Sequence, residues 1–263
     1  MKIMKQNTHS LTAKPRHNWL GLASLAAGLL AWWMAAHYGG LPSFILPSPA
    51  QVWTRFLRSL TDGSLFFHAG VTLFEILTGL LVGALAATIL GYLVAKSRAL
   101  ERILSPYLVA SQAVPLVAIA PLLVIWFGPG IFSKVLICAL IVFFPVLVNT
   151  VVGVRAVPIA LHNLMHSLRA TRGQILLKLE IPAALPVFLG GLRIGATLSV
   201  IGAVVGELVG ADMGLGFLIN VGRGQYDTAL VFVAIFALVV LALSLYGLVS
   251  FAEKRLLSWQ DAA

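Results

Sequence analysis

The chain has 263 residues, of which 60% are hydrophobic and only 10% are charged. A soluble domain carries about 25% charged residues, so the composition excludes an ordinary water-soluble protein and predicts an all-α integral membrane protein. The net charge of +9 does not indicate nucleic-acid binding, because the lysines and arginines stand in short clusters between apolar segments. The single cysteine, Cys138, excludes a disulfide or a cysteine metal site within one chain.

Six segments are apolar over enough residues to cross a bilayer as helices, which takes about 20 residues. They lie near 19–38, 69–95, 104–127, 131–154, 187–210 and 229–251. Residues 19–255 are therefore expected to form one six-helix transmembrane domain. The remaining residues are tails at 1–18 and 256–263, and the longest loop within the domain is at about 156–186.

The distribution of lysine and arginine predicts how the chain is oriented in the membrane. If the N-terminus is cytoplasmic, thirteen of these cations fall on the cytoplasmic side, and four fall outside, namely Arg55, Arg58, Lys134 and Arg223. The cytoplasmic loops of membrane proteins carry the excess of positive charge. Both chain termini and the loop at 156–186 are therefore predicted to be cytoplasmic.

The segment 39–66 is then predicted to lie outside. Ser48 can cap a helix whose first residue is Pro49. From Val52 to Leu60, apolar and basic residues alternate at helical spacing. This pattern predicts a short helix at the outer membrane surface.

The third span contains Ser111, Gln112, Pro115 and a second proline within its apolar sequence. A proline removes a backbone hydrogen bond, and the freed carbonyl must be satisfied by a neighbouring helix or a water-lined cavity. Ser111, Gln112 and Pro115 therefore either line a translocation pathway or mark a kink that is packed inside the bundle. Asn149, in a fourth span that also contains a proline, has the same two interpretations.

The fifth span combines small residues with a charge. Gly191, Gly195, Ser199, Gly202 and Gly206 recur every three or four positions, which predicts close helix packing. Glu207 follows them, and a charge at membrane depth is by default a candidate functional group. It either belongs to the translocation pathway or binds backbone amides of the loop at 210–224. An ion-driven secondary transporter would need such carboxylates, and Glu75 and Glu207 are the candidates.

The loop at 156–186 has the pattern of an amphipathic helix. Leu164 and Leu168 belong to an apolar stripe, and charged and amide side chains occupy the other faces. Pro182 ends the helical segment before the fifth span. The loop is either a solvated amphipathic segment or a helix that docks into the groove of a partner protein.

Motifs of catalysis are absent from the sequence. It contains no phosphate-binding G-x-x-x-x-G-K-[ST] loop, no G-x-S-x-G and no H-E-x-x-H, although His162 and His166 are spaced four apart. We therefore predict that the chain is not an enzyme and holds no metal. Any ATP that drives transport is hydrolysed by another chain.

The same loop resembles the signature of the inner-membrane permease subunit of binding-protein-dependent ABC importers, E-A-A-x3-G-x9-I-x-L-P. Leu179 takes the position of the isoleucine in this motif, and Arg169 takes the position of the glycine. That glycine lets the backbone turn between two short helices, and an arginine does not adopt positive φ cheaply. The turn is therefore expected either at Gly173 or nowhere, with the two helices continuous. LPSPAQVW, ASQAVPLVAIAPLLVIWFGPG and GELVGADMGLGFLI are also similar to the nitrate, sulfonate, taurine and vitamin-precursor branch of the family.

The resemblance implies a type I importer bundle in a bacterial cell membrane, with this chain as a homodimer. It further implies a cytoplasmic ABC ATPase dimer, which binds ATP and Mg, an outer solute-binding protein and no cofactor in this chain. The substrate expected is riboflavin or a thiamine-type pyrimidine; the alternatives are alkanesulfonate, taurine or nitrate. The loop then acts as a coupling helix on the ATPase, through Leu164, Leu168, Arg169, Arg172, Gly173, Gln174, Lys178, Glu180 and Pro182.

Overall fold

The computed structural model describes residues 18–113 and 116–258 of the chain. Every regular element in these residues is a helix, as the composition predicts. In chain order the elements are α1 (Asn18–Tyr38), α2 (Pro49–Thr61), α3 (Ser64–Lys96), α4 (Arg98–Ala113), α5 (Leu116–Phe127), α6 (Ile131–Arg155), α7 (Ile159–Ser167), α8 (Arg172–Ile175), the π-helical turn η1 (Leu176–Glu180), α9 (Ile181–Gly210), α10 (Leu215–Gly224) and α11 (Thr228–Leu256).

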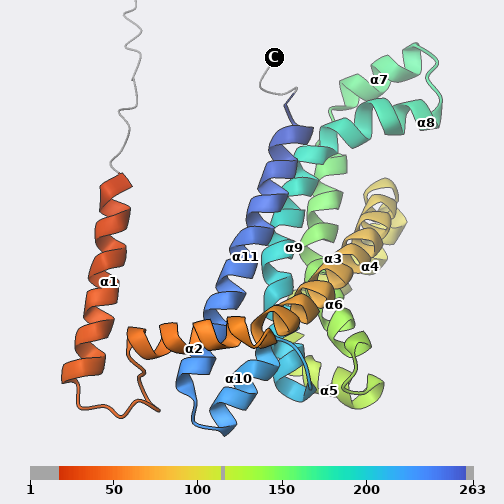
Figure 1. Cartoon of the computed structure of the whole chain (residues 1–263). Coiled ribbons are helices and arrows are strands. Elements are labelled where there is room, and N and C mark those ends of the chain that lie inside the picture. Colours follow the sequence, from red (N-terminus) through yellow and green to blue (C-terminus); the bar gives the residue numbers. More distant parts are fainter. Residues whose placement is uncertain (1–17, 114–115, 259–263) are drawn as a thin grey trace, which may run out of the picture.

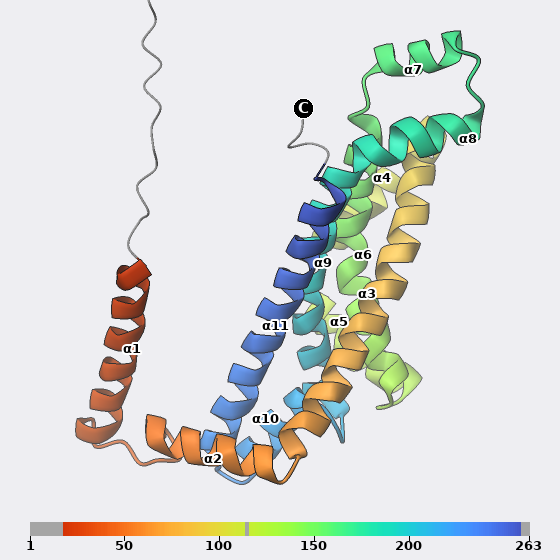
Figure 2. The same cartoon turned by 45° about the horizontal axis from the view of Figure 1, so that its top comes forward.

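The long helices α3, α6, α9 and α11 form a bundle (Figure 1). Helices α2 and α10 lie across one end of the bundle, and α7 and α8 project from the opposite end (Figures 1 and 2). The start of α1 and the last turn of α11 are also directed toward the end that carries α7 and α8. The bundle therefore has two distinct ends, one with the α7–α8 hairpin and one with α2 and α10.

Glycines bring α3 and α9 into close contact with α6, which lies between them. A Cβ atom at Gly79 of α3 would lie 2.3 Å from the Cβ of Cys138, and one at Gly191 of α9 would lie 2.5 Å from the Cβ of Asn149. Gly202 and Gly206 of α9 also meet α6. The small residues of the fifth predicted span are therefore packing residues, as expected for helices that approach closely in lipid.

Four of the six predicted spans are confirmed as helices of spanning length. The apolar helical stretches Ser64–Lys96, Ile131–Arg155, Arg172–Gly210 and Thr228–Leu256 are each long enough to cross a bilayer. Helix α1 has the position and length predicted for the first span, but it is not among these four. The predicted count of six spans is therefore not confirmed.

The third predicted span, near 104–127, is helical in its described parts. Helix α4 ends at Ala113 and α5 begins at Leu116, and the two residues between them lie outside the described residues. A single spanning helix at this position therefore stays a prediction.

The short helix predicted within 39–66 is confirmed as α2, and its outer location stays a prediction. Ser48 is its N-cap, and its Oγ accepts a hydrogen bond from the backbone N–H of Gln51 at 3.3 Å. The side chain of Gln51 accepts in return from the Ser48 N–H at 2.9 Å, and Pro49 is the first helical residue. This capping box fixes the start of the helix as the sequence indicates.

Helix α1 stands to one side of the bundle in both views (Figures 1 and 2). It is attached through Trp32, whose ring stacks on Phe232 of α11 with the centroids 5.3 Å apart. The indole N–H of Trp32 also donates to the carbonyl of Pro47 at 3.0 Å. Most other large side chains of α1, such as Leu25 and Leu30, are exposed.

Candidate functional site

The predicted loop is a helical hairpin at one end of the bundle. Helix α7 runs over Ile159–Ser167, and α8, η1 and α9 follow one another without a break from Arg172. The Thr171 side chain caps α8 by accepting from the Gln174 N–H at 3.3 Å, and Gln174 Oε1 accepts in return from the Thr171 N–H at 2.8 Å. Gln174, a predicted coupling residue, is thereby engaged in local structure.

The turn between α7 and α8 occurs at Arg169, which corrects both expectations, a turn at Gly173 and a continuous helix. Arg169 has φ of 53°, and Gly173 lies inside α8 with open space around it. The N–H of Ala170 donates to the carbonyl of Met165, and the N–H of Arg169 donates to that of His166, both at 2.9 Å. These two bonds form a Schellman motif, which holds the arginine in the left-handed conformation that glycine favours.

Most predicted coupling residues lie on the exposed surface of the hairpin. Leu168 is 69% exposed and Leu164 is 54% exposed, although both are large and apolar. Arg169, Arg172, Gly173, Gln174 and Lys178 are exposed as well, and Pro182 is half-buried. The hairpin thus presents apolar side chains and cations together on its exposed surface, which is suited to a protein partner.

Glu180 is the exception, because the structure buries it. Its side chain is 2% exposed and accepts hydrogen bonds from three residues. Lys96 of α3 forms an ion pair with Oε1, His162 Nε2 of α7 lies 3.1 Å from the same oxygen, and the Tyr92 hydroxyl of α3 donates to Oε2 at 3.1 Å. Glu180 therefore cannot contact a partner directly, and we call it, with Tyr92, Lys96 and His162, the Glu180 cluster.

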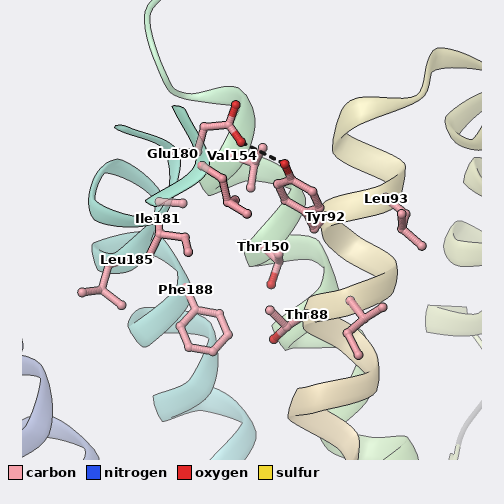
Figure 3. A pocket seen from close by; sticks show the side chains of 12 residues that line it. Thr88, Tyr92, Leu93, Thr150, Val154, Glu180, Ile181, Leu185 and Phe188 are labelled. Carbon is pink, nitrogen blue, oxygen red and sulfur yellow. Dashed lines mark hydrogen bonds between the residues drawn. The ribbon is translucent and has the colours of Figure 1, made fainter. Parts of the chain in front are cut away.

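A cavity of about 420 Å³ lies directly beside this cluster. Thr88 and Tyr92 of α3, Thr150 and Val154 of α6, and Phe188 of α9 line it together with Glu180 (Figure 3). In the close-up, the Glu180–Tyr92 hydrogen bond spans the upper end of this space. Below the cluster, α3 and α9 are therefore separated by a space rather than by packed side chains.

The structure describes some of the residues predicted to line the translocation pathway and not others. The side chains of Ser111 and Gln112, and the whole of Pro115, lie outside the described residues. Asn149 is half-buried, its Nδ2 donates to the Pro145 carbonyl at 2.8 Å, and its side chain packs against Gly191. Its place in a translocation pathway stays a prediction.

Glu207 is fully buried at the end opposite the hairpin. The Thr72 hydroxyl of α3 donates to its Oε1 at 2.6 Å, and the N–H of Gly216 at the start of α10 donates to its Oε2. The alternative in which Glu207 binds backbone amides of the outer loop thus describes its observed contacts. The backbone at Gly214 packs tightly against the Glu207 carboxyl group, since a Cβ at Gly214 would lie 2.2 Å from its carboxyl carbon.

Glu75 lies next to Glu207, and both side chains are buried. Oε2 of Glu75 has no hydrogen-bond partner among the described residues. Glu75 and the buried Lys134 border a second cavity, of about 560 Å³. The ammonium group of Lys134 thus lies near two buried carboxyl groups and offsets their negative charge.

Two further ion pairs lie nearer the hairpin end. Arg193 of α9 pairs with Glu253 of α11 at 3.1 Å, so its charge is compensated within the bundle. Arg155 at the end of α6 pairs with Glu101 of α4, and more than a third of each side chain is exposed. The hydrogen bond from Arg155 lowers the pKa of the Glu101 carboxyl. This second pair is an exposed counterpart of the buried pair between Lys96 and Glu180.

Sequence reasoning did not identify Tyr92, Lys96 and His162 as partners of Glu180. In the sequence, His162 is distinguished only by its spacing of four residues from His166. Among the described residues, no group of three or more metal-ligating side chains occurs. Tyr92 and Lys96 lie more than 80 positions from Glu180 along the chain. Nothing in their local sequence indicates this contact, which only the packing of α3 against η1 creates.

Comparison with solved structures shows the fold. The chain is similar to the structure titled "Inward facing conformations of the MetNI methionine ABC transporter", with a TM-score of 0.62, 19% identity, and coverage of 75% of this chain and 96% of that one. It is also similar to the structure titled "Crystal structure of an amino acid ABC transporter with histidines", with a TM-score of 0.58, 21% identity, and coverage of 76% and 98%.

Comparison with curated sequences shows the family. The chain is 47% identical to the riboflavin transport system permease protein RibX of Chloroflexus aurantiacus, over 93% of this chain and 92% of that protein. It is 38% identical to the formylaminopyrimidine transport permease protein ThiX of Halalkalibacterium halodurans, over 88% and 92%. Identity with the taurine transport system permease protein TauC of Escherichia coli is 33%, over 91% and 89%. Residues 79–258 match the model of the binding-protein-dependent transport system inner membrane component. The chain therefore belongs to this family of multi-pass inner membrane proteins, the permease subunits of ABC importers, which are not themselves catalytic.

Proposed function

We propose that the chain forms the membrane pathway of an importer for a vitamin or vitamin precursor, either riboflavin or a thiamine-type pyrimidine. The supporting observation is the 47% identity with a riboflavin permease over nearly the whole of both chains. Identity with the formylaminopyrimidine permease is 38%, and identity with the taurine permease is 33%. Alkanesulfonate, taurine and nitrate are therefore the less favoured substrates.

The permease works with other chains. A binding-protein-dependent ABC importer implies an ATPase and a solute-binding protein, and its permease binds no cofactor itself. ATP and Mg belong to the ATPase in this scheme. Family membership also decides against the ion-driven transporter that Glu75 and Glu207 had left open. We infer that two copies of this chain pair as a homodimer over an ATPase dimer.

The α7–α8 hairpin is the coupling element in this proposal. Exposed Leu164 and Leu168 would enter a groove on the ATPase, and Arg169, Arg172 and Lys178 would face its surface charges. ATP binding would draw the two ATPases together and carry the hairpins with them. The hairpin is then the contact through which nucleotide occupancy favours one of two states of the bundle.

The orientation follows from the charge distribution. Thirteen cations against four favour a cytoplasmic location for the hairpin end. The start of α1 and the end of α11 point to this same end of the bundle, which supports cytoplasmic termini (Figure 1). The outer end, with α2 and α10, would then receive the solute-binding protein.

An uptake experiment tests the substrate. The chain is reconstituted in proteoliposomes with its ATPase and its solute-binding protein, and uptake of riboflavin, formylaminopyrimidine and taurine is measured with and without ATP. We expect ATP-dependent uptake of riboflavin or the pyrimidine and none of taurine. Uptake of taurine alone would overturn the vitamin assignment, and uptake without ATP would overturn the ABC mechanism.

The predicted pathway residues can be tested in the same system. Cysteine is placed at Asn149 and at Gln112, since the native Cys138 is buried. If these positions face the pathway, a small polar thiol reagent will modify them in at least one nucleotide state. Resistance in both states would assign them to helix packing.

A further inference from the structure

Helix α7 has few attachments to the rest of the protein. None of its residues is buried in the described chain, and the turn at Arg169 is held by hydrogen bonds within the hairpin itself. Among the described side chains, the hydrogen bond that connects α7 to another element is the one between His162 and Glu180. A force applied to α7 therefore reaches the bundle through the chain itself and through this contact.

Glu180 also contacts α3, a helix that is distant from the hairpin in the sequence. It lies in η1, directly before α9, and its carboxylate also binds Tyr92 and Lys96 of α3. One buried side chain thus joins α7, the start of α9 and the end of α3. Since Lys96 is 40% exposed and His162 is 25% exposed, both partners lie at the rim and Glu180 lies at the centre.

The surroundings of the cluster leave room for movement. The cavity of about 420 Å³ lies beside Glu180, between α3, α6 and α9 (Figure 3). The segment that bears Glu180 is a π-helical turn, a geometry that occurs often at functional sites. At this depth the polar cluster, rather than close packing, holds η1 against α3.

We propose that the Glu180 cluster is a coupling joint, in which His162 and Glu180 are positioning residues that transmit displacement of α7 to α3. This inference rests on the proposed role of the hairpin in contacting the ATPase. Without the hydrogen bond from His162, movement of α7 would reach Glu180, and through it α3, only along the backbone of α8 and η1. Helices α7 and α3 would then move less closely together, and less uptake would accompany each ATP hydrolysed.

The test compares uptake with hydrolysis in the complete importer, with riboflavin as the probe. His162→Ala removes the hydrogen bond between α7 and Glu180 and leaves Glu180 bound to Tyr92 and Lys96. We expect riboflavin taken up per ATP hydrolysed to fall about fivefold, the low end of typical coupling between two sites. His162→Gln retains a side-chain N–H donor and is expected to restore most of this ratio.

Glu101→Gln is the matched control. It removes the carboxylate of an exposed ion pair near the same end of the protein, outside the hairpin and the cluster. The ratio should stay at the wild-type value in this variant. If His162→Ala does not assemble, Glu180→Gln, which preserves the shape of the side chain, takes its place and should show the same fall. Failure of both variants to assemble would make the cluster a folding element and overturn the joint.

A further variant separates this inference from the proposed function. Arg172→Glu reverses an exposed charge on α8 and should uncouple uptake if the hairpin contacts the ATPase. Full uptake by Arg172→Glu would overturn the coupling role of the hairpin. Loss of uptake by Arg172→Glu, together with a wild-type ratio in His162→Ala, would leave the coupling role intact and overturn only the joint.

Discussion

Two buried glutamates at opposite ends of the bundle are stabilised in different ways. Glu207 is fully buried, and its described hydrogen-bond partners are a threonine hydroxyl and a backbone amide, both within the bundle. Glu180 is buried to a similar degree, but two of its partners, Lys96 and His162, are partly exposed, and His162 lies on the projecting α7. The first arrangement fixes α10 on α3, and the second connects a projecting element to the bundle. A buried glutamate thus holds helices in place at one end, and in our proposal a buried glutamate transmits movement of α7 to α3 at the other.

The largest effect is expected at the end of the bundle that carries α2 and α10. Glu207→Ala would leave the Thr72 hydroxyl and the Gly216 N–H buried without their acceptor. Each buried polar group left without a partner costs about 1–3 kcal/mol of the free energy of unfolding, and two such groups are left here. We expect a large drop in the apparent melting temperature of the detergent-solubilised protein, measured by near-UV circular dichroism. A variant as stable as the wild type would show that Glu207 does not hold α10 in place.

A smaller effect at the same end tests the geometry rather than the charge. Gly214 has φ of 107°, and a Cβ there would collide with the Glu207 carboxyl group. Gly214→Ala should therefore destabilise the protein by about 2 kcal/mol, the range of a strained backbone position. Gly224→Ala, later in α10 and in open space, is the matched control and should have little effect. Equal melting temperatures for the two variants would contradict this packing.

The smallest effect is expected at the hairpin end, with the opposite sign. Arg169 occupies a left-handed conformation that costs about 1–2 kcal/mol for a residue other than glycine. Arg169→Gly removes this strain but adds roughly 0.5–1 kcal/mol of backbone entropy in the unfolded chain. A net gain of about 0.5 kcal/mol follows, which careful thermal unfolding of the purified protein can detect. A clear loss of stability would mean that the guanidinium group makes a stabilising contact in the assembled protein.

Local sequence signals predicted the elements that depend on local forces. The N-cap at Ser48 and the first helical residue at Pro49 were identified from side chains that act within one turn. The glycines of the fifth span indicated close packing, and Gly191, Gly202 and Gly206 do contact α6.

The turn at Arg169 shows the limit of motif reasoning. The family motif has glycine at this position, and the presence of arginine suggested that the backbone would turn elsewhere. The structure retains the turn, since the Schellman hydrogen bonds to Met165 and His166 hold the backbone whatever the side chain. A preference of about 1–2 kcal/mol can be overridden by such local hydrogen bonds.

The amino-acid sequence alone indicates that the chain is a helical membrane protein, where its apolar segments lie and which loop is suited to a partner. These properties follow from the solvation and the helical periodicity of each segment taken separately. The burial of Glu180 among exposed neighbours in the hairpin depends instead on the packing of distant helices. So do the contacts of Glu207 with Thr72 and with the start of α10. Both outcomes depend on residues that are distant in the chain and meet only when helices pack, so no local sequence pattern predicts them.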